Sequence, residues 1–288
     1  MGSDVIISIR DLVKSFRAPD GHEVRILDGV TFDVFRSETL VIMGGSGCGK
    51  STLLNCLIGE YSISGGQILF RTERMPEPRD LAAMNESETN ELRKRFGILF
   101  QSGALFNSIT VAQNVALPIK EHSQVPDRLV DTMVTVKLNL VRMLEHRDKM
   151  PAQLSGGQKK RVGLARATAM DPEILFYDEP SAGLDPVTSA AIDDLIMDLS
   201  GKLAVTSVVV THEMDSAFRI ADRMVMLHQG RVLKIATRAE FETLRSADPV
   251  SLSSRQDQLI NQFLNGYSAG PLTDEQGRSQ YEQLLISG

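Results

Sequence analysis

Residues 44–51 read GGSGCGKS, and this stretch decides the fold. Its spacing matches the phosphate-binding loop pattern G-x-x-x-x-G-K-[ST] without a mismatch. The apolar run at 39–43 predicts a buried strand before the loop, and residues 51–58 predict the start of a helix after it. The loop, called the P-loop below, therefore has the strand-to-helix context that the motif requires.

The glycines of the P-loop let the backbone turn tightly enough to direct successive N–H groups at phosphate oxygens. The N-terminus of the following helix adds partial positive charge at the same place. We expect Lys50 to reach the β- and γ-phosphates and take part in catalysis, and Ser51 to bind Mg²⁺. The nucleotide-binding residues expected here are Gly44, Gly45, Ser46, Gly47, Cys48, Gly49, Lys50, Ser51 and Thr52. The alternative, a glycine-rich turn without chemical meaning, leaves the lysine and serine unexplained.

The composition is that of an ordinary globular protein, with 42% hydrophobic and 24% charged residues among 288. Acidic residues outnumber basic ones by 37 to 31, so no bulk positive field attracts nucleic acid or anionic lipid. No apolar run approaches the roughly 20 residues that span a bilayer, and the N-terminus lacks the pattern of a signal peptide. We therefore expect neither export nor insertion, and membrane association only through a partner. Two cysteines, Cys48 and Cys56, form no disulfide framework and suit a reducing cytosol.

Outside the P-loop the hydrophobic pattern predicts two α/β portions separated by a helical insertion. Strands are expected at 5–16 (an edge strand and turn), 30–35, 67–70, 96–100, 174–179, 205–210, 224–227 and 232–235. Helical patterns cover 110–150, a basic helix after residue 158, 186–199 and 256–266, and residues 71–90 are expected to be a surface excursion. The strands before the P-loop should be antiparallel. Phe16, at the end of the first strand, is as compatible with a core position as with stacking on adenine.

Two positions late in the chain suggest catalytic chemistry. The apolar run at 174–179 ends in Asp178 and Glu179, which is a Walker B pattern. Asp178 would bind Mg²⁺ through water, and Glu179 would polarise the attacking water. His212 follows the strand expected at 205–210, and ligands gather at the C-terminal ends of strands in open α/β sheets. A lone histidine is usually structural, but this one stands where the phosphates are expected.

The order of these motifs, with Gln101, LSGGQ at 154–158 and SAGLD at 181–185, resembles the ATP-binding-cassette (ABC) ATPases along residues 5–240. LSGGQ is the most specific signal, because a P-loop alone would also fit GTPases, kinases and helicases. The resemblance implies an α/β P-loop NTPase fold with an antiparallel β subdomain and a helical subdomain at about 102–170. Residues 241–288 would form a linker, a short helix and a tail.

The resemblance also implies two ATP molecules, with Mg²⁺, at the interface of a head-to-tail dimer. Each ATP would lie between the P-loop of one copy and the signature residues of the other. Those residues are Ser155, Gly156, Gly157 and Gln158. Asp185 and Phe16 would also contact the nucleotide, although Phe16 stands where tyrosine is usual. Gln101 would contact Mg²⁺ or water, and Glu179, His212, Gln101 and Lys50 would be the catalytic residues.

A narrower similarity, to the Mla/MCE phospholipid-transport ATPases, rests on 100–106, 114–118 with Glu121 and His122, and 262–266 with Gly270 and Pro271. That family implies a membrane permease, an MCE-domain lipid-binding subunit and often a small STAS-domain protein as partners. The chain would then be peripheral at the cytoplasmic face of the inner membrane. Residues 272–288 match nothing recognisable. The apolar stripe of residues 259–264 must be buried, and its pattern fits packing on its own subunit as well as on another copy. In this family the C-terminal segment reaches across the dimer, so the resemblance favours packing on the neighbouring copy.

The sequence was also compared with three other classes of ATPase. The chain could be an ABC ATPase for another substrate. SMC-type DNA-maintenance ATPases share the P-loop, signature and Walker B motifs, but they place hundreds of coiled-coil residues where this chain has about a hundred compact ones. Translation-factor ATPases usually carry two cassettes, whereas this sequence carries one.

Overall fold

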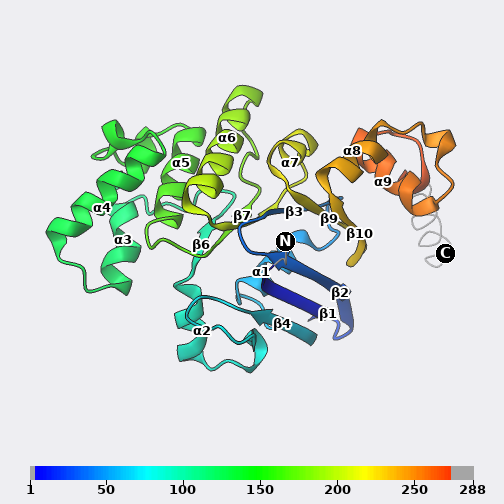
Figure 1. Ribbon diagram of the computed structural model, residues 1–288, viewed down its shortest axis with the longest axis horizontal. Helices are drawn as coiled ribbons and strands as arrows, with labels where there is room; N and C mark the ends of the chain where they lie inside the picture. The colour runs from blue at the N-terminus through cyan, green and yellow to red at the C-terminus, as the bar shows by residue number, and fades with distance from the viewer. Residues whose placement is uncertain (1–3, 274–288) are drawn as a thin grey trace.

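The computed structural model describes residues 4–273 (Figure 1). The strands are β1 (Val5–Arg17), β2 (Glu23–Phe35), β3 (Thr39–Gly44), β4 (Gly65–Phe70), β5 (Arg79–Asp80), β6 (Phe96–Leu99), β7 (Ile174–Asp178), β8 (Thr206–Val210), β9 (Arg223–His228) and β10 (Arg231–Thr237). The α-helices are α1 (Lys50–Leu57), α2 (Glu86–Arg93), α3 (Val111–His122), α4 (Asp127–Leu140), α5 (Gly156–Ala167), α6 (Pro186–Leu203), α7 (Met214–Ile220), α8 (Arg238–Ser246) and α9 (Arg255–Asn265). Short 3₁₀ helices are η1 (Leu81–Ala83), η2 (Leu144–His146), η3 (Pro151–Gln153) and η4 (Pro249–Ser251).

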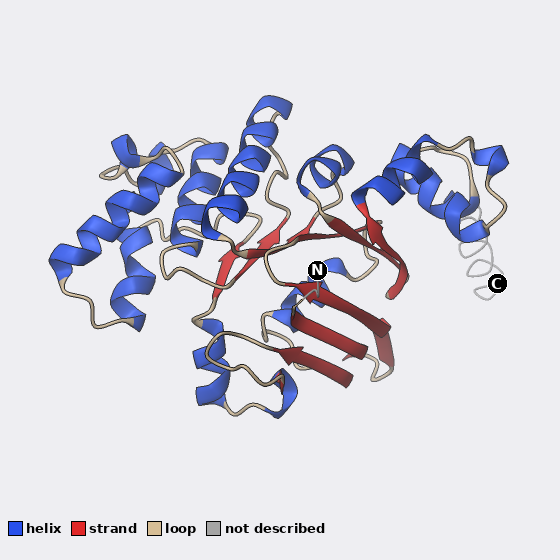
Figure 2. Ribbon diagram, in the orientation of Figure 1, coloured by secondary structure: helices blue, strands red, loops and turns tan. Residues whose placement is uncertain are grey.

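The larger sheet has the strand order β10-β9-β3-β8-β7-β6 and is parallel except for β10. Its central strands are apolar on both faces because both faces are covered, as Figure 2 shows, by helices on one side and by α1 with the second sheet on the other. Alternate residues of β3 pack in different hydrophobic cores. Val41 and Met43 lie in the core between the larger sheet and the helices, called the helical core below, and Leu40 and Ile42 lie in the core between the two sheets.

The smaller sheet is antiparallel, with the order β2-β1-β4-β5. The sequence expectation of an edge strand at 5–16 was wrong, because β1 lies between β2 and β4. The second strand also begins earlier than expected: the ladder with β1 continues to Phe16 opposite Val24 and Arg17 opposite Glu23. Polar side chains on the exposed face of the ladder hide such a strand from a search for apolar runs.

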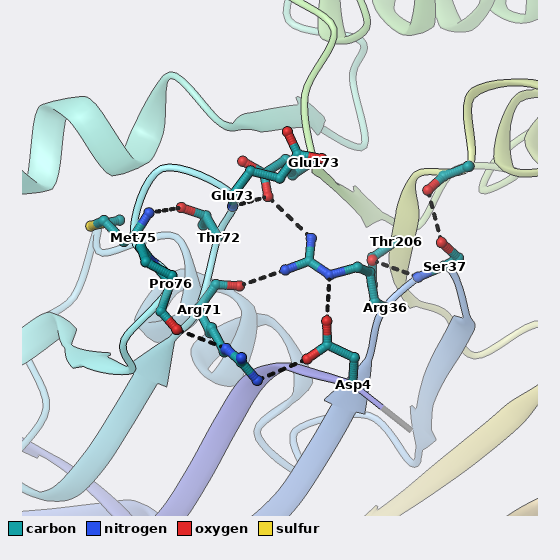
Figure 3. Close-up of polar contacts among 11 residues, drawn as sticks. Asp4, Arg36, Ser37, Arg71, Thr72, Glu73, Met75, Pro76, Glu173 and Thr206 are labelled. Atoms are coloured by element: carbon teal, nitrogen blue, oxygen red, sulfur yellow. Dashed lines mark hydrogen bonds and ion pairs between the residues drawn. The ribbon is translucent and has the colours of Figure 1, made fainter. Parts of the chain in front are cut away.

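An arginine fastens the two sheets together at the N-terminal end of β7 (Figure 3). The guanidinium of Arg36 contacts the carboxylates of Asp4, at 3.1 Å, and Glu173, at 3.2 Å. The neighbouring amide of Ser37 donates to Oγ1 of Thr206, at 2.9 Å, at the start of β8. These contacts join the antiparallel sheet to the larger sheet at the N-terminal ends of β7 and β8. The P-loop lies at the opposite edge, where β3 ends.

The C-terminal helices pack on their own chain. Ile260 and Leu264 of α9 are buried in the helical core, and the Asn261 amide donates to the carbonyl oxygens of Leu244 and Ala247 after α8. The expectation that this apolar stripe packs on a neighbouring copy was therefore wrong for its buried residues. Spacing alone shows that a stripe must be covered but does not show by what. None of the helices between residues 4 and 273 combines the length and hydropathy needed to span a bilayer.

Candidate functional site

Parallel strands of the larger sheet carry the expected site residues to one edge. The P-loop follows β3, Asp178 ends β7, and His212 follows β8. Val210 pairs with both Ile42 and Asp178, so these strands end at the same level. Leu99 of β6 lies opposite Tyr177 of β7, so the residues two positions further on, Gln101 and Glu179, leave the sheet at the same edge.

The P-loop needs glycine at its two ends for different reasons. Gly44 has a φ of 151°, and a side-chain Cβ there would lie 2.3 Å from the carbonyl oxygen of Leu227. Gly49 is the left-handed N-cap of α1, with a φ of 107°, and no side chain caps the helix. The first N–H groups of α1 therefore lack a side-chain acceptor, which is the arrangement that binds phosphate.

Lys50 lies inside the P-loop and is only 8% exposed. Its ammonium donates hydrogen bonds to the carbonyl oxygens of Gly44, at 2.7 Å, and Gly45, at 3.0 Å. The cation is thus held within the loop that would surround the phosphates. Ser46, Gly47 and Ser51 are exposed, and Gly45 and Thr52 are half-buried. Burial raises the pKa of the Cys48 thiol despite the charge of Lys50, which keeps the thiol protonated.

Asp178 has the features of a cation ligand. Its Oδ1 is buried and has no hydrogen-bond partner among residues 4–273. Burial raises the pKa of this carboxyl, and the neighbouring Glu179 raises it further, while the charges of Lys160 and Lys50 lower it. An unsatisfied carboxylate oxygen in this position fits a hard cation such as Mg²⁺. Residues 4–273 contain no cluster of three His, Cys, Asp or Glu that could hold a metal, so the ligand set would have to include hydroxyl, amide or phosphate oxygens.

Glu179 and His212 form a pair beside Asp178. Glu179 takes the left-handed backbone conformation, with a φ of 48°, which non-glycine residues rarely adopt. Its N–H donates to the carbonyl oxygen of Val210 at 2.9 Å, and its Oε1 lies 2.7 Å from Nδ1 of His212. The His212 side chain is 59% exposed and that of Glu179 11%. The strained turn therefore aims the carboxylate at an imidazole whose other nitrogen remains accessible.

Sequence reasoning missed Lys160, which supports this pair from α5. Its side chain is almost fully buried, and its ammonium donates to the carbonyl oxygen of Glu179 at 2.9 Å. Burial lowers the pKa of Lys160, while the carboxylates of Asp178, Glu179 and Glu213 oppose the shift. The available signal was spacing: Gly157, Lys160 and Leu164 follow one another at helical intervals on the buried face.

The signature residues serve their own chain as a helix start. Ser155 caps α5 and Gln158 completes a capping box. Gly157 packs so closely on α6 that a Cβ would lie 2.4 Å from Cγ2 of Thr188. Within residues 4–273, no hydrogen bond or ion pair joins residues 155–158 to the P-loop. Hydrogen bonds and ion pairs within the described part of one copy therefore do not link the signature to the P-loop.

Two further predicted residues have local roles. Asp185 is the N-cap of α6 and accepts hydrogen bonds from the amides of Val187 and Thr188 and from the Thr188 hydroxyl. Phe16 is 38% exposed, meets Tyr61 edge-to-face at a centroid distance of 5.4 Å, and has the Lys14 ammonium 4.6 Å from its ring centre. Gln101 is exposed in the turn after β6. Their nucleotide and metal contacts stay predictions.

Comparisons with known proteins agree with this geometry. A family model described as ABC transporter matches residues 27–182. The intermembrane phospholipid transport system ATP-binding protein MlaF of Escherichia coli is 36% identical over 263 residues, which cover 91% of each chain. The mkl protein of Mycobacterium leprae, named as a probable ribonucleotide transport ATP-binding protein, is 36% identical over 293 residues, which cover 100% of this chain and 78% of that one. A solved dimeric ATP-binding cassette in a post-hydrolysis state, bound to ADP and Pi, has a TM-score of 0.72 and 26% identity over 81% of this chain and 99% of its own.

Proposed function

The chain belongs to the ABC transporter family of ATP-hydrolysing subunits, and on this premise we propose that it powers phospholipid transport at the inner membrane. The similarity to MlaF is the observation that supports the substrate class. It extends well beyond the segment matched by the family model, so it covers more than the motifs that all ABC ATPases share.

The proposed hydrolysis uses the groups gathered at the sheet edge. The uncapped N–H groups of α1 and the ammonium of Lys50 would bind the phosphates. Glu179 would orient and polarise the attacking water, and the exposed nitrogen of His212 would contact the γ-phosphate. Ser51, Gln101 and Asp178 would hold Mg²⁺, which when bound neutralises charge on the phosphate oxygens. Lys160 holds the Glu179 turn in place through its carbonyl.

We propose that the working unit is a head-to-tail dimer. Ser155 caps α5, and within residues 4–273 no hydrogen bond or ion pair joins the signature residues to the P-loop, so a second copy would supply them. The dimeric state of the solved cassette with similar structure supports this arrangement. In such a dimer the N-terminus of α5 would face the γ-phosphate on the partner copy.

A cleft beside Gln101 is the proposed docking place for the membrane permease. Its lining combines exposed aromatic side chains with charged ones, including Phe100, Phe106, Glu121 and Arg166. It lies between β6 and α3, next to the turn that carries Gln101. The MCE-domain subunit and the STAS-domain protein would belong to the same assembly at the cytoplasmic face of the membrane, and this chain would attach through the permease.

Three alternatives to phospholipid transport can be distinguished from it. The name of the mkl relative favours ribonucleotide transport as a second candidate. The longest helix between the P-loop and the signature is α4, with 14 residues, which leaves no room there for an SMC-type coiled coil. Translation-factor ATPases remain distinguishable by association with ribosomes.

The test is to purify the full chain with its native membrane complex, identify bound lipid by mass spectrometry, and assay ATP hydrolysis after reconstitution. Phospholipid in the complex and faster hydrolysis with phospholipid vesicles are expected. If only added ribonucleotides stimulated ATP hydrolysis, ribonucleotides would replace phospholipid as the proposed substrate. Copurification with DNA or ribosomes would overturn the transport role.

The docking cleft has its own test in the same preparation. Glu121→Lys should lower transport more than it lowers basal ATP hydrolysis, because it reverses charge in the cleft without touching the site. Glu77→Lys is the matched control, since Glu77 is exposed and lies outside the cleft. Equal loss of transport and basal hydrolysis in Glu121→Lys would show that the residue supports folding instead.

A further inference from the structure

Three polar contacts join α6 to α7, the short helix that follows His212. On the α7 side they recur every three residues, at the N-cap Glu213 and at Ser216 and Arg219, so they form one seam. The contacts are Ser189 Oγ to Glu213 Oε2 at 3.4 Å, Ser216 Oγ to Asp193 Oδ1 at 2.6 Å, and Arg219 Nη2 to Asp194 Oδ1 at 2.6 Å. Apolar residues of both helices, among them Ile196 and Ala217, pack in the same core.

The middle contact of the seam is buried. Asp193 is 3% exposed and Ser216 4%, so their hydrogen bond is shielded from water. Burial raises the pKa of Asp193, while the hydrogen bond from Ser216 and the charge of Arg219 oppose that shift. Apolar side chains could join two helices without desolvating a carboxyl group. What the polar pair adds is direction, because the 2.6 Å hydrogen bond weakens when α7 moves on α6 and its distance and angle depart from the favoured geometry.

The position of α7 matters because His212 immediately precedes it. The helix has seven residues, and no side chain caps its N-terminus. A helix of this length is not stable alone, so its docking on α6 determines where it begins. His212 touches Glu179 through Nδ1 and its own amide, and its side chain is otherwise largely exposed. A shift of α7 would therefore move the imidazole relative to Glu179.

We propose that Asp193 and Ser216 are positioning residues for His212. By fixing α7 on α6 they hold the imidazole beside Glu179 at the distance that hydrolysis requires. The proposal rests on the role proposed for His212 in hydrolysis, and it assigns a purpose to a buried titratable group that the chemistry itself does not use.

The test is a double-mutant cycle on steady-state and single-turnover ATP hydrolysis by the full-length protein. Ser216→Ala removes the donor, and we expect kcat to fall about tenfold while the Kd for ATP changes little, since small misplacements of a catalytic group lower rates without removing the binding contacts. In the His212→Ala background, the same Ser216→Ala change should alter the residual rate by less than about twofold, because a residue that acts through His212 has nothing left to position. Asp193→Asn keeps an acceptor for the Ser216 hydroxyl and should stay near the wild-type rate, whereas Asp193→Ala should match Ser216→Ala.

Asp198→Asn is the control, because Asp198 is an exposed carboxylate of the same helix, and its ion pair is with Lys202, also in α6. Its rate should equal that of the wild type. Thermal unfolding of every variant identifies losses that come from instability, and Ser216→Ala, which removes only a hydroxyl, carries the test where Asp193→Ala does not fold. Multiplicative losses in the cycle, or a wild-type kcat in Ser216→Ala, would overturn the positioning role. Either result would leave the ATPase and transport assignments standing, since those fail only if the wild-type protein does not hydrolyse ATP or carries no phospholipid.

Discussion

The imidazole of His212 lies 2.7 Å from the carboxylate of Glu179, between Nδ1 and Oε1. The two residues come from the ends of neighbouring strands, β7 and β8, and the left-handed backbone at Glu179 turns its side chain toward the imidazole. The contact leaves the second imidazole nitrogen for another partner, while Oε2 of Glu179 accepts from the backbone amide of His212 at 3.3 Å and keeps a further lone pair for one. A water and a phosphate are the partners that the surrounding P-loop suggests.

Glu179→Gln is expected to bind Mg-ATP with an affinity close to that of the wild type and to hydrolyse it at least about 100-fold more slowly. The glutamine keeps the shape of the side chain but cannot take a proton from the attacking water. Single-turnover hydrolysis and size-exclusion chromatography with ATP measure the rate and the trapped dimer. Normal turnover would remove Glu179 from its proposed role.

His212→Ala should also reduce hydrolysis while leaving nucleotide affinity less changed, because the P-loop contacts remain. The expected loss in kcat is about 10- to 100-fold, at the lower end of what a positioned acid or base contributes. Measurements of kcat and of the Kd for ATP separate the two effects. An unchanged rate would mean that His212 only supports the backbone of Glu179.

Asp185 gives a pH-dependent prediction. The side-chain and backbone hydrogen bonds from Thr188 hold the pKa of this carboxyl below its ordinary value. Since the folded-state pKa is the lower one, the stability that the cap provides is present above the unfolded pKa of about 3.9 and is lost as the pH falls through the lowered folded value.

Thermal unfolding in a pH series that runs from about 7 downward through the unfolded pKa of about 3.9 provides the measurement. Asp185→Ala should lower Tm most at neutral pH and approach the wild type in acid. Asp185→Asn should keep much of the cap at every pH, because its amide oxygen still accepts from the backbone. A constant difference between wild type and Asp185→Ala at all pH values would contradict the capping role.

Ile260→Ala should destabilise the isolated chain by about 2–5 kcal/mol, the range for truncating a buried isoleucine. Ile260 is fully buried in the helical core of its own chain.

Phe263 is only partly buried at the margin of the same core and lines the pocket beside the P-loop, so Phe263→Asp should weaken assembly more than folding. Urea unfolding and analytical ultracentrifugation separate stability from assembly. If Ile260→Ala left the unfolding free energy unchanged, the expectation that this stripe packs on a neighbouring copy would be restored.

Several parts of the fold were predictable because the information is local. The strand, turn and helix around the P-loop need only glycines at positive φ and an apolar run on each side. The expected α/β fold class is confirmed by the solved cassettes of similar structure. The extent of β2 was not predictable from apolar runs, because its exposed face carries polar residues. The nucleotide, metal and catalytic roles of single residues stay predictions, and the experiments above address them.

The sequence by itself determined which chemical groups the protein has and which short segments present them, since turn geometry, strand alternation and helix capping depend on neighbours in the chain. Only the tertiary structure decided which of these groups meet. It brought Glu179 to His212 and Lys160 to the carbonyl of Glu179. It made the signature serine the cap of α5 and turned the apolar face of α9 onto its own core. Those outcomes depend on strand order and on which surface covers an apolar stripe. The periodicity of a sequence carries no information about either, because the same stripe can be buried by the same chain or by another copy.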